Sequence, residues 1–426
     1  MIPAAAHQEG KNIYRTLEQY AKQRNVDNNE LEIVVFANNP KGTERDITIN
    51  EIRRFQQAHP DTKVRLIEQA LDEKDAKIGW VRKAATDTVL TDLQRRGIDL
   101  NEVLLVSNDA DSEWIDENYI RTIIDKAEAQ PEVDGFLGFI DWGYDAYRAH
   151  PEMLAATRMM QMIEIYLRRS KDQIGSSGAN FIFRPGAYTA VGGYKTTSSV
   201  GEDVELGRMI KGMRSGAKTR RPIAFLGRSS EVNTSARRAL EKLFKDGGAP
   251  IEQWSVEFSA NDELRTKDFG LKDFDFSDRG AVEEMVKSTE HMLNRTIRAY
   301  SQSLASERSE TYQYGTINVY DYETTRNLNR MMSVIGVKTR WNPDGTIKIV
   351  DASRMIANLQ RWQVQHGGRE RLPMFKREGR QIRLPRAVAA AERFEERSKE
   401  LNARSKERLD EAIERFKAVG AERTTT

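Results

Sequence analysis

Apolar residues follow two alternating periods along the first half of the chain. Ile13, Leu17 and Tyr20 share one helix face within residues 12–23, and residues 31–42 form a β-rich run closed by Asn, Pro and Gly. The same periods predict helices at 46–58, 78–95 and 151–168, and strands at 63–69, 102–111 and 135–142. Strands that alternate with helices predict an α/β fold, with a mostly parallel sheet flanked by helices on both faces.

The pattern changes near residue 240. Residues 222–235 are predicted as two short strands, and charged helical segments predominate beyond them. We therefore divide the chain into a sheet-containing domain (1–240), a mainly helical extension (241–366), a basic linker (367–386) and a charged amphipathic helix with its tail (387–426). The last helix is expected to pack along one narrow stripe or in a short coiled coil, and the alternative is that the linker contacts RNA or a membrane.

The composition excludes several classes of protein and site. Of 426 residues, 67 are Lys or Arg and 65 are Asp or Glu, so the net charge of +2 does not indicate a nucleic-acid binder. The absence of cysteine excludes disulfides and thiolate sites, and the five histidines are scattered, so a metal site would consist mainly of carboxylates, which suits Mg²⁺ or Mn²⁺. No apolar stretch approaches the roughly 20 residues that cross a bilayer, so we expect a cytoplasmic protein, peripheral at the membrane at most.

Two aspartates, Asp109 and Asp111, end the strand that begins near residue 102. In an extended chain their side chains share a face, unless the chain turns at Ala110. Carboxylates that lie so close repel each other, and a divalent cation removes this repulsion. Because Mg²⁺ takes one or two carboxylates and completes its shell with water and phosphate oxygens, the pair indicates a nucleoside diphosphate site. The alternative is a turn in which Asp111 or Ser112 caps a helix that starts near Glu113.

A second acidic pair, Glu202 and Asp203, follows Gly201 at the predicted start of a helix. The helix dipole favours ionised carboxylates at this end. Two interpretations stay open: ordinary capping of the helix, or a general base that deprotonates an acceptor hydroxyl.

Six segments, in this order, resemble the nucleotide-sugar glycosyltransferases of the GT-A fold, and family 2 in particular. They are IPAAAHQEGKNIYRTLEQ (2–19), EIVVFANN (32–39), IGWVRKAATD (78–87), VSNDAD (106–111), GANFIFRPGAYTAVGGYKTTSSVGEDVELGRMI (178–210) and VNTSARR (232–238). The resemblance covers about residues 1–240 and leaves the remainder unmatched. It implies a GT-A fold and metal-dependent transfer of a sugar from a nucleoside-diphosphate sugar to an acceptor hydroxyl, with inversion favoured over retention.

The resemblance also implies roles for single residues. Asp203 would be the catalytic base and Glu202 would support it. Asp111 would ligate Mn²⁺ or Mg²⁺, and Asp109 would face the metal or the ribose. Contacts with the donor are implied for Pro3, Ala4, Glu9, Asn38, Arg82, Asn108, Asp109 and Arg238, and Arg82 would reach toward the diphosphate. The loop beside the donor sugar and the acceptor would contain Gly178, Asn180, Gly192 and Gly193.

The chain departs from the family pattern near the expected donor site. Phe36 and Ala37 stand where the second strand often carries an aspartate that reads uracil. Residues 232–238 contain no histidine to serve as a third metal ligand, and Arg237 and Arg238 could instead meet phosphate. The donor and the acceptor (a glycan, a lipid-linked or a small molecule) therefore stay open. The alternatives are a retaining GT-A enzyme, or a non-catalytic scaffold; in either case the C-terminal helices could hold a partner or a second copy.

Overall fold

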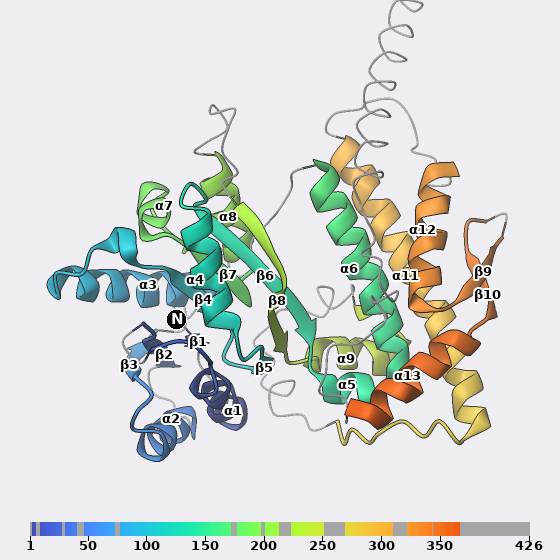
Figure 1. Cartoon of the computed structure of the whole chain (residues 1–426), viewed down its shortest axis with the longest axis horizontal. Coiled ribbons are helices and arrows are strands. Elements are labelled where there is room, and N and C mark those ends of the chain that lie inside the picture. The colour runs from blue at the N-terminus through green and yellow to red at the C-terminus, as the bar shows by residue number, and fades with distance from the viewer. Residues whose placement is uncertain are drawn as a thin grey trace, which may run out of the picture. The chain divides into compact units, whose positions relative to one another are not determined.

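The computed structural model describes most of the first 366 residues (Figure 1). The described residues are 2–5, 9–27, 30–40, 47–72, 77–171, 177–196, 201–212, 223–250, 269–309, 322–342 and 344–366. The chain divides into two compact units, which are residues 1–162 with 174–374 and residues 163–173 with 375–426. The candidate site lies within the first unit. The predicted basic linker (367–386) and final helix (387–426) lie outside the described residues.

Three parallel strands form the first sheet, in the order β1-β2-β3. The strands and the helices between and after them are β1 (Ile2–Ala5), α1 (Gly10–Ala21), β2 (Ile33–Pro40), α2 (Ile47–Ala58), β3 (Val64–Leu71) and α3 (Ile78–Arg95). Ile13, Leu17 and Tyr20 of α1 are all buried, as their spacing along one helix face predicts. Parallel strands bring their carboxyl ends to one edge of a sheet, which is where α/β folds bind ligands.

The second sheet is mixed, in the order β4-β7-β6-β8-β5. Its strands are β4 (Leu105–Asn108), β5 (Ser112–Ile115), β6 (Gly135–Trp142), β7 (Asn180–Phe183) and β8 (Ile223–Thr234). Only β6 and β8 pair in parallel, whereas β4 with β7, β6 with β7 and β5 with β8 are antiparallel. The α/β fold class is confirmed, but this sheet is less parallel than the sequence pattern predicts. Residues 144–171, which separate β6 from β7, are mostly helical, yet these two strands pair antiparallel, so a helix between two strands does not by itself make them parallel.

Strand β8 (Ile223–Thr234) is one strand, so the prediction of two short strands in 222–235 is wrong. The pairing of β8 with β6 passes from Gly138–Gly227 directly to Phe139–Glu231, so that residues 228–230 fall outside the register. Gly227 has a backbone φ of 77°, which residues other than glycine rarely adopt. This break in the pairing explains why the sequence pattern resembles two strands.

Helices cover the two sheets, which share one core. The remaining helices up to residue 246 are η2 (Leu100–Glu102), α4 (Tyr119–Ala129), α5 (Tyr144–Ala149), α6 (Pro151–Lys171), α7 (Pro185–Ala190), α8 (Glu202–Gly212) and α9 (Arg237–Asp246). Strand β1 of the first sheet lies beside β4 of the second. Ile2 and Val35 from the first sheet pack in the same apolar cluster as Ile182 and Val232 from the second. The shared core fixes the edges of the two sheets relative to each other.

The described part of residues 241–366 contains three long helices and one hairpin. These elements are α11 (Arg279–Ser309), α12 (Tyr322–Ile335), β9 (Lys338–Trp341), β10 (Ile347–Asp351) and α13 (Ser353–His366). The hairpin was not apparent from the sequence pattern. Trp362 of α13 is buried and meets the ring of Tyr144 edge-on at 6.2 Å, so this region packs on the sheet-containing part. Within the described ranges, no helix has the length and apolar character needed to span a membrane.

Candidate functional site

The guanidinium of Arg82 lies at the centre of the candidate site. Arg82 is on α3, and its side chain is 6% exposed. Its Nη2 donates to Asp109 Oδ1 at 2.7 Å, and its Nε donates to Glu202 Oε1 at 2.9 Å. Its Nη1 donates to Ser107 Oγ at 2.7 Å and to the carbonyl of Gly178 at 3.3 Å. One buried cation therefore holds together the end of β4, the loop before β7 and the first turn of α8.

Burial and the neighbouring charges shift the pKa values of Arg82 and of the acids around it. Burial raises the pKa of Asp109, and Arg82 only partly offsets this effect. Burial likewise raises the pKa of Glu202, with Arg82 opposing and Asp203 adding to the rise. Burial lowers the pKa of Arg82, but Asp109 and the neighbouring acids outweigh this and raise it overall. Burial also raises the pKa of Glu113, on β5, to about 7. Such a surplus of carboxylates favours the binding of a further cation.

Asp111 binds a different arginine from Asp109, because the chain turns at Ala110 and Asp111. Arg237 Nη2 donates to Asp111 Oδ2 at 2.6 Å and lies 3.4 Å from Glu9 Oε1. The hydroxyl of Thr234 donates to Asp111 Oδ1 at 3.2 Å. Residues 112–115 form β5, so the alternative of a helix capped by Asp111 or Ser112 is wrong.

Glu202 and Asp203 begin α8, as their position after Gly201 predicts. Asp203 accepts hydrogen bonds from the backbone N–H of Gly178 and, at 2.7 Å, from that of Val204. Glu202 is buried at 4% exposure, whereas Asp203 is partly exposed. Asp203 is therefore the acid of this pair that an incoming molecule can reach, and Glu202 is held by Arg82.

The buried amides of Asn108 and Asn180 form hydrogen bonds with neighbouring strands and helices. Asn108 accepts from the hydroxyl of Tyr20 at 2.5 Å and donates to the carbonyl of Ala179 at 2.9 Å. Asn180 accepts from the hydroxyl of Tyr119 at 2.7 Å and donates to two main-chain carbonyls, of Phe139 and Ser230, at 3.0 and 2.8 Å. Because both amides are buried and bonded to protein groups, their predicted contacts with donor and acceptor stay predictions.

Asn38 differs from these two amides. It lies near the carboxyl end of β2 at 1% exposure, and neither atom of its amide finds a hydrogen-bond partner among the described residues. Buried polar groups without a partner are rare, and each one calls for an explanation such as a missing ligand. Pro3 and Ala4 lie on β1 in register with Phe36 and Ala37 of the same sheet.

Two other residues with predicted donor contacts occupy different surroundings. Glu9 shares Arg237 with Asp111. Its Oε2 accepts a hydrogen bond from Asn12 at 3.0 Å, and its Oε1 faces Arg237. Arg238 is exposed, and it is its neighbour Arg237 that reaches Asp111. The sequence motif indicated both arginines, and the first turn of α9 decides which of them faces the acids.

The glycines of the predicted sugar loop occupy positions that exclude a side chain. Gly192 and Gly193 have φ values of 79° and 78°, and a Cβ on Gly193 would lie 2.5 Å from the hydroxyl of Tyr188. A Cβ on Gly178 would lie 2.3 Å from Nη2 of Arg82. Gly178 therefore makes room for the buried guanidinium, in addition to any contact with a ligand.

Replacing Gly178 with Ala is expected to destabilise the protein by about 1–3 kcal/mol, because the new methyl group displaces the Arg82 guanidinium from its partners. The matched control is Gly186→Ala on α7, where an added Cβ meets nothing within 4 Å. Urea denaturation of the two variants measures the difference. Equal stability of Gly178→Ala and the wild-type protein would show that the guanidinium does not occupy this position.

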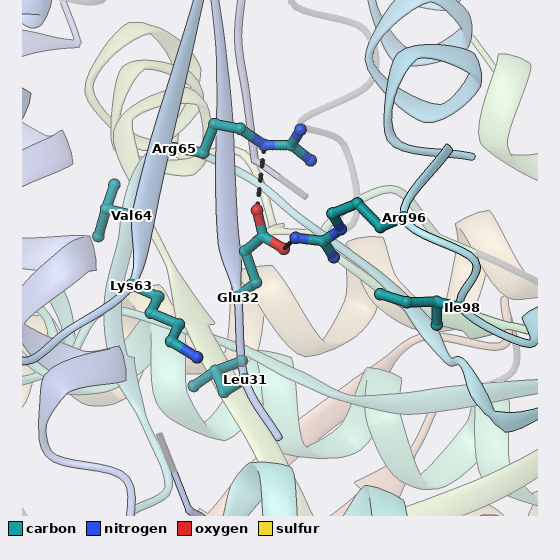
Figure 2. Close-up of a pocket in the computed structure, with 7 residues that line it drawn as sticks. All are labelled: Leu31, Glu32, Lys63, Val64, Arg65, Arg96 and Ile98. Atoms are coloured by element: carbon teal, nitrogen blue, oxygen red, sulfur yellow. Dashed lines mark ion pairs between the residues drawn. The ribbon is translucent and has the colours of Figure 1, made fainter. Parts of the chain in front are cut away.

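A pocket of about 610 Å³ lies at the opposite end of the first sheet (Figure 2). It is lined by residues that precede or begin β2 and β3 and follow α3, namely Leu31, Glu32, Lys63, Val64, Arg65, Arg96 and Ile98. Glu32 stands between Arg65 and Arg96, with ion pairs of 3.1 and 3.2 Å. The pocket lies at the amino ends of the strands, so it is separate from the cluster around Arg82.

Among solved structures, a mannosyltransferase from Pyrobaculum calidifontis in complex with GDP-mannose and Mn²⁺ matches with 15% identity and a TM-score of 0.34, covering 78% of this chain and 84% of that one. No curated protein matches the chain.

A family model described as "Glycosyltransferase like family 2" matches residues 1–245 of the 426. The match spans all six segments on which the resemblance rests, and with the order of strands and helices it confirms the GT-A fold class. The chain therefore belongs to glycosyltransferase family 2 and is a glycosyltransferase.

Proposed function

We propose that the protein transfers a sugar from a nucleoside-diphosphate sugar to an acceptor hydroxyl, with inversion and with a divalent cation. The observation that carries this proposal is the double ion pair of Arg82 with Asp109 and Glu202. It joins Asp109, directly after β4, to Glu202 at the start of α8, although Arg82 and Glu202 are 120 positions apart in the sequence. Donor-binding acids and a candidate base thus belong to one site.

The residues at this site fit a divalent cation. Asp109 and Asp111 supply carboxylate oxygens, and Mg²⁺ or Mn²⁺ needs only one or two of these when phosphate and water complete the shell. Within the described ranges, no cluster of three or more possible metal ligands occurs. In the described ranges, Arg82 pairs with Asp109 and Glu202, and Arg237 pairs with Asp111 and Glu9. A cation bound by the aspartates would stabilise the departing nucleoside diphosphate.

Asp203 is the group that we assign as the general base. Its carboxylate is partly exposed and is held by the N–H groups of Gly178 and Val204, which fixes its direction. A carboxylate held in this way can accept a proton from the acceptor hydroxyl. Glu202 supports the base by anchoring the first turn of α8 to Arg82. A base on the face opposite the leaving group gives inversion, whereas a retaining enzyme would not need one there.

Asn38 is the group that we assign to the nucleobase. Phe36 and Ala37 are buried and apolar, so they cannot replace an aspartate that reads uracil. The amide of Asn38, one residue further along β2, offers both a donor and an acceptor without a protein partner among the described residues. A base edge would satisfy both groups, so binding of the nucleotide would remove the cost of burying them.

A panel of nucleotide sugars tests the proposed function by thermal unfolding. With Mn²⁺ present, we expect one class among GDP-, UDP- and dTDP-sugars to stabilise the protein by about 2.7 kcal/mol at 100 times its Kd. Stabilisation should be much smaller when EDTA removes the metal. If no nucleotide sugar stabilises the protein and none is hydrolysed, the non-catalytic scaffold becomes the better account.

The variant Asp111→Ala is expected to weaken donor binding in Mn²⁺ by at least tenfold, because it removes a ligand of the cation. The donor's Kd in EDTA should change much less, since the variant acts through the metal. Titration calorimetry of both conditions measures this difference. Asp125→Ala on α4 is the control, because Asp125 is exposed and pairs only with Arg121 at the surface. An unchanged response to Mn²⁺ in Asp111→Ala would contradict its assignment as a ligand.

A further inference from the structure

Strand β5 departs from regular pairing directly after the aspartate pair. Ser112 lies opposite Thr234 on β8, and Trp114 lies opposite Asn233. Two steps along β5 thus correspond to one step along β8, so that Glu113 is the extra residue of a β-bulge. Bulges beside active sites often redirect a side chain.

The bulge brings two adjacent side chains to the same neighbouring segment. In a regular strand, successive side chains point to opposite faces of the sheet. Here the carboxylate of Glu113 lies against Gly143, and the ring of Trp114 lies 5.8 Å from the ring of Tyr144, the next residue. A carboxylate and an indole therefore stand next to each other.

The Glu113 carboxylate rests directly on the backbone of Gly143. A Cβ at Gly143 would lie 1.7 Å from Oε2 of Glu113, so no larger residue fits while Glu113 keeps this position. The φ of Gly143 is −55°, which any residue can adopt, so the glycine is needed for space and not for its backbone conformation. Glu113 makes no hydrogen bond or ion pair with the residues that the structure describes, and it is only half-buried. Its oxygens are available to a ligand.

Trp114 is the most exposed of three aromatic rings that contact one another in a row. Its ring is half-buried and tilted by 35° against Tyr144. Tyr144 in turn meets Trp362 edge-on, and both of these rings are buried. These ring contacts hold the half-buried indole in place.

This pair borders the proposed metal ligand. The hydroxyl of Thr234 donates to Asp111 at 3.2 Å, and the carbonyl of the same residue accepts from the N–H of Gly143 at 2.9 Å. Thr234 thus contacts both the donor-binding acid and the segment on which Glu113 rests. A molecule bound at Glu113 and Trp114 would lie next to the site of sugar transfer.

We propose that Glu113, Trp114 and Gly143 form a subsite for a neutral saccharide, which is the acceptor of the transfer. This proposal rests on the proposed function. A carboxylate accepts hydrogen bonds from two sugar hydroxyls, and an indole face packs against the apolar C–H groups of a pyranose ring. The acceptor class is therefore a glycoside that offers hydroxyls to the carboxylate and a C–H face to the indole.

Binding of methyl glycosides tests the subsite without any donor. The probes are methyl α- and β-glycosides of mannose, glucose and galactose, observed by saturation-transfer NMR on the full chain. We expect at least one to bind saturably, and we expect Gly143→Ala and Glu113→Gln each to raise its Kd by at least tenfold. Gly186→Ala is the matched control and should bind as the wild-type protein does, since nothing lies within 4 Å of an added Cβ there.

Three outcomes decide the proposal. Failure of every glycoside to bind would overturn it, as would unchanged binding in both variants while their unfolding matches the wild type. Tighter binding of a glycoside phosphate than of the neutral glycoside would also overturn it. Saccharide binding without any binding of nucleotide sugars would retain the subsite and reject the proposed donor, whereas the reverse result would reject the subsite alone.

Discussion

Replacing Asp203 with Asn is expected to lower donor turnover by about 100- to 10,000-fold while the Kd of the donor changes less than twofold. A general base contributes an acceleration of this size, and Asn keeps the shape of the side chain but cannot take a proton. Water can serve as the acceptor, so release of the nucleoside diphosphate measures turnover before the natural acceptor is identified. Titration calorimetry measures the Kd.

The control for this experiment lies on the same helix turn. Glu205 is half-buried and pairs with Lys195 at 2.6 Å, so Glu205→Gln changes a carboxylate of α8 outside the site. We expect Glu205→Gln to retain wild-type turnover. Comparable losses in the two variants would point to a general effect on α8, and full activity of Asp203→Asn would remove Asp203 from the role of base.

Replacing Arg82 with Met is expected to destabilise the protein by about 3–5 kcal/mol, because it leaves two buried carboxylates without their cation. Asp109 and Glu202 both bind the Arg82 guanidinium, and Glu202 is 5% exposed. The ion pair of Arg121 and Asp125 at the surface provides the control, and Arg121→Met should destabilise the protein much less, because solvent screens a surface ion pair. Urea denaturation of both variants measures these differences. A small effect of Arg82→Met would show that the two acids are neutralised in another way.

The same variant should acquire a characteristic pH dependence. Burial raises the folded-state pKa of Asp109 and Glu202, and loss of Arg82 removes the charge that opposes this rise. A carboxyl group whose pKa is raised by folding stabilises the folded state when protonated, so stability increases as the pH falls through the raised pKa. Arg82→Met should therefore recover part of the lost stability in mildly acidic buffer, and Arg82→Met with Glu202→Gln should recover part of it at neutral pH.

The sequence predicts the local features of this protein well. Ile13, Leu17 and Tyr20 indicate α1 because a single helix face must be apolar to pack on the sheet. Asn38 and Asp109 mark the ends of β2 and β4 approximately, because they interrupt apolar runs, although β2 ends at Pro40 and β4 ends at Asn108 instead of the predicted residue 111. The start of α8 is apparent because two acids follow a glycine.

Long-range pairings could not be predicted in the same way. The sequence indicated Arg82 as a contact of the diphosphate, and nothing in its local pattern shows that it binds Glu202, 120 positions away. The bulge at Glu113 depends on the pairing of β5 with β8, so a single strand cannot reveal it. The mixed second sheet has the same origin, since strand direction is set by which strands become neighbours.

The anomeric configuration of the first product of donor hydrolysis tests the central claim most directly. Proton NMR identifies the anomer that the wild-type protein releases from an α-linked nucleotide sugar to which it binds. The reaction is run in Mg²⁺, because Mn²⁺ would broaden the NMR signals. If Asp203 activates the incoming hydroxyl opposite the leaving diphosphate, the β-anomer of the free sugar appears first, and EDTA abolishes its formation. Initial formation of the α-anomer, or hydrolysis that continues unchanged in EDTA, would contradict metal-dependent transfer with inversion.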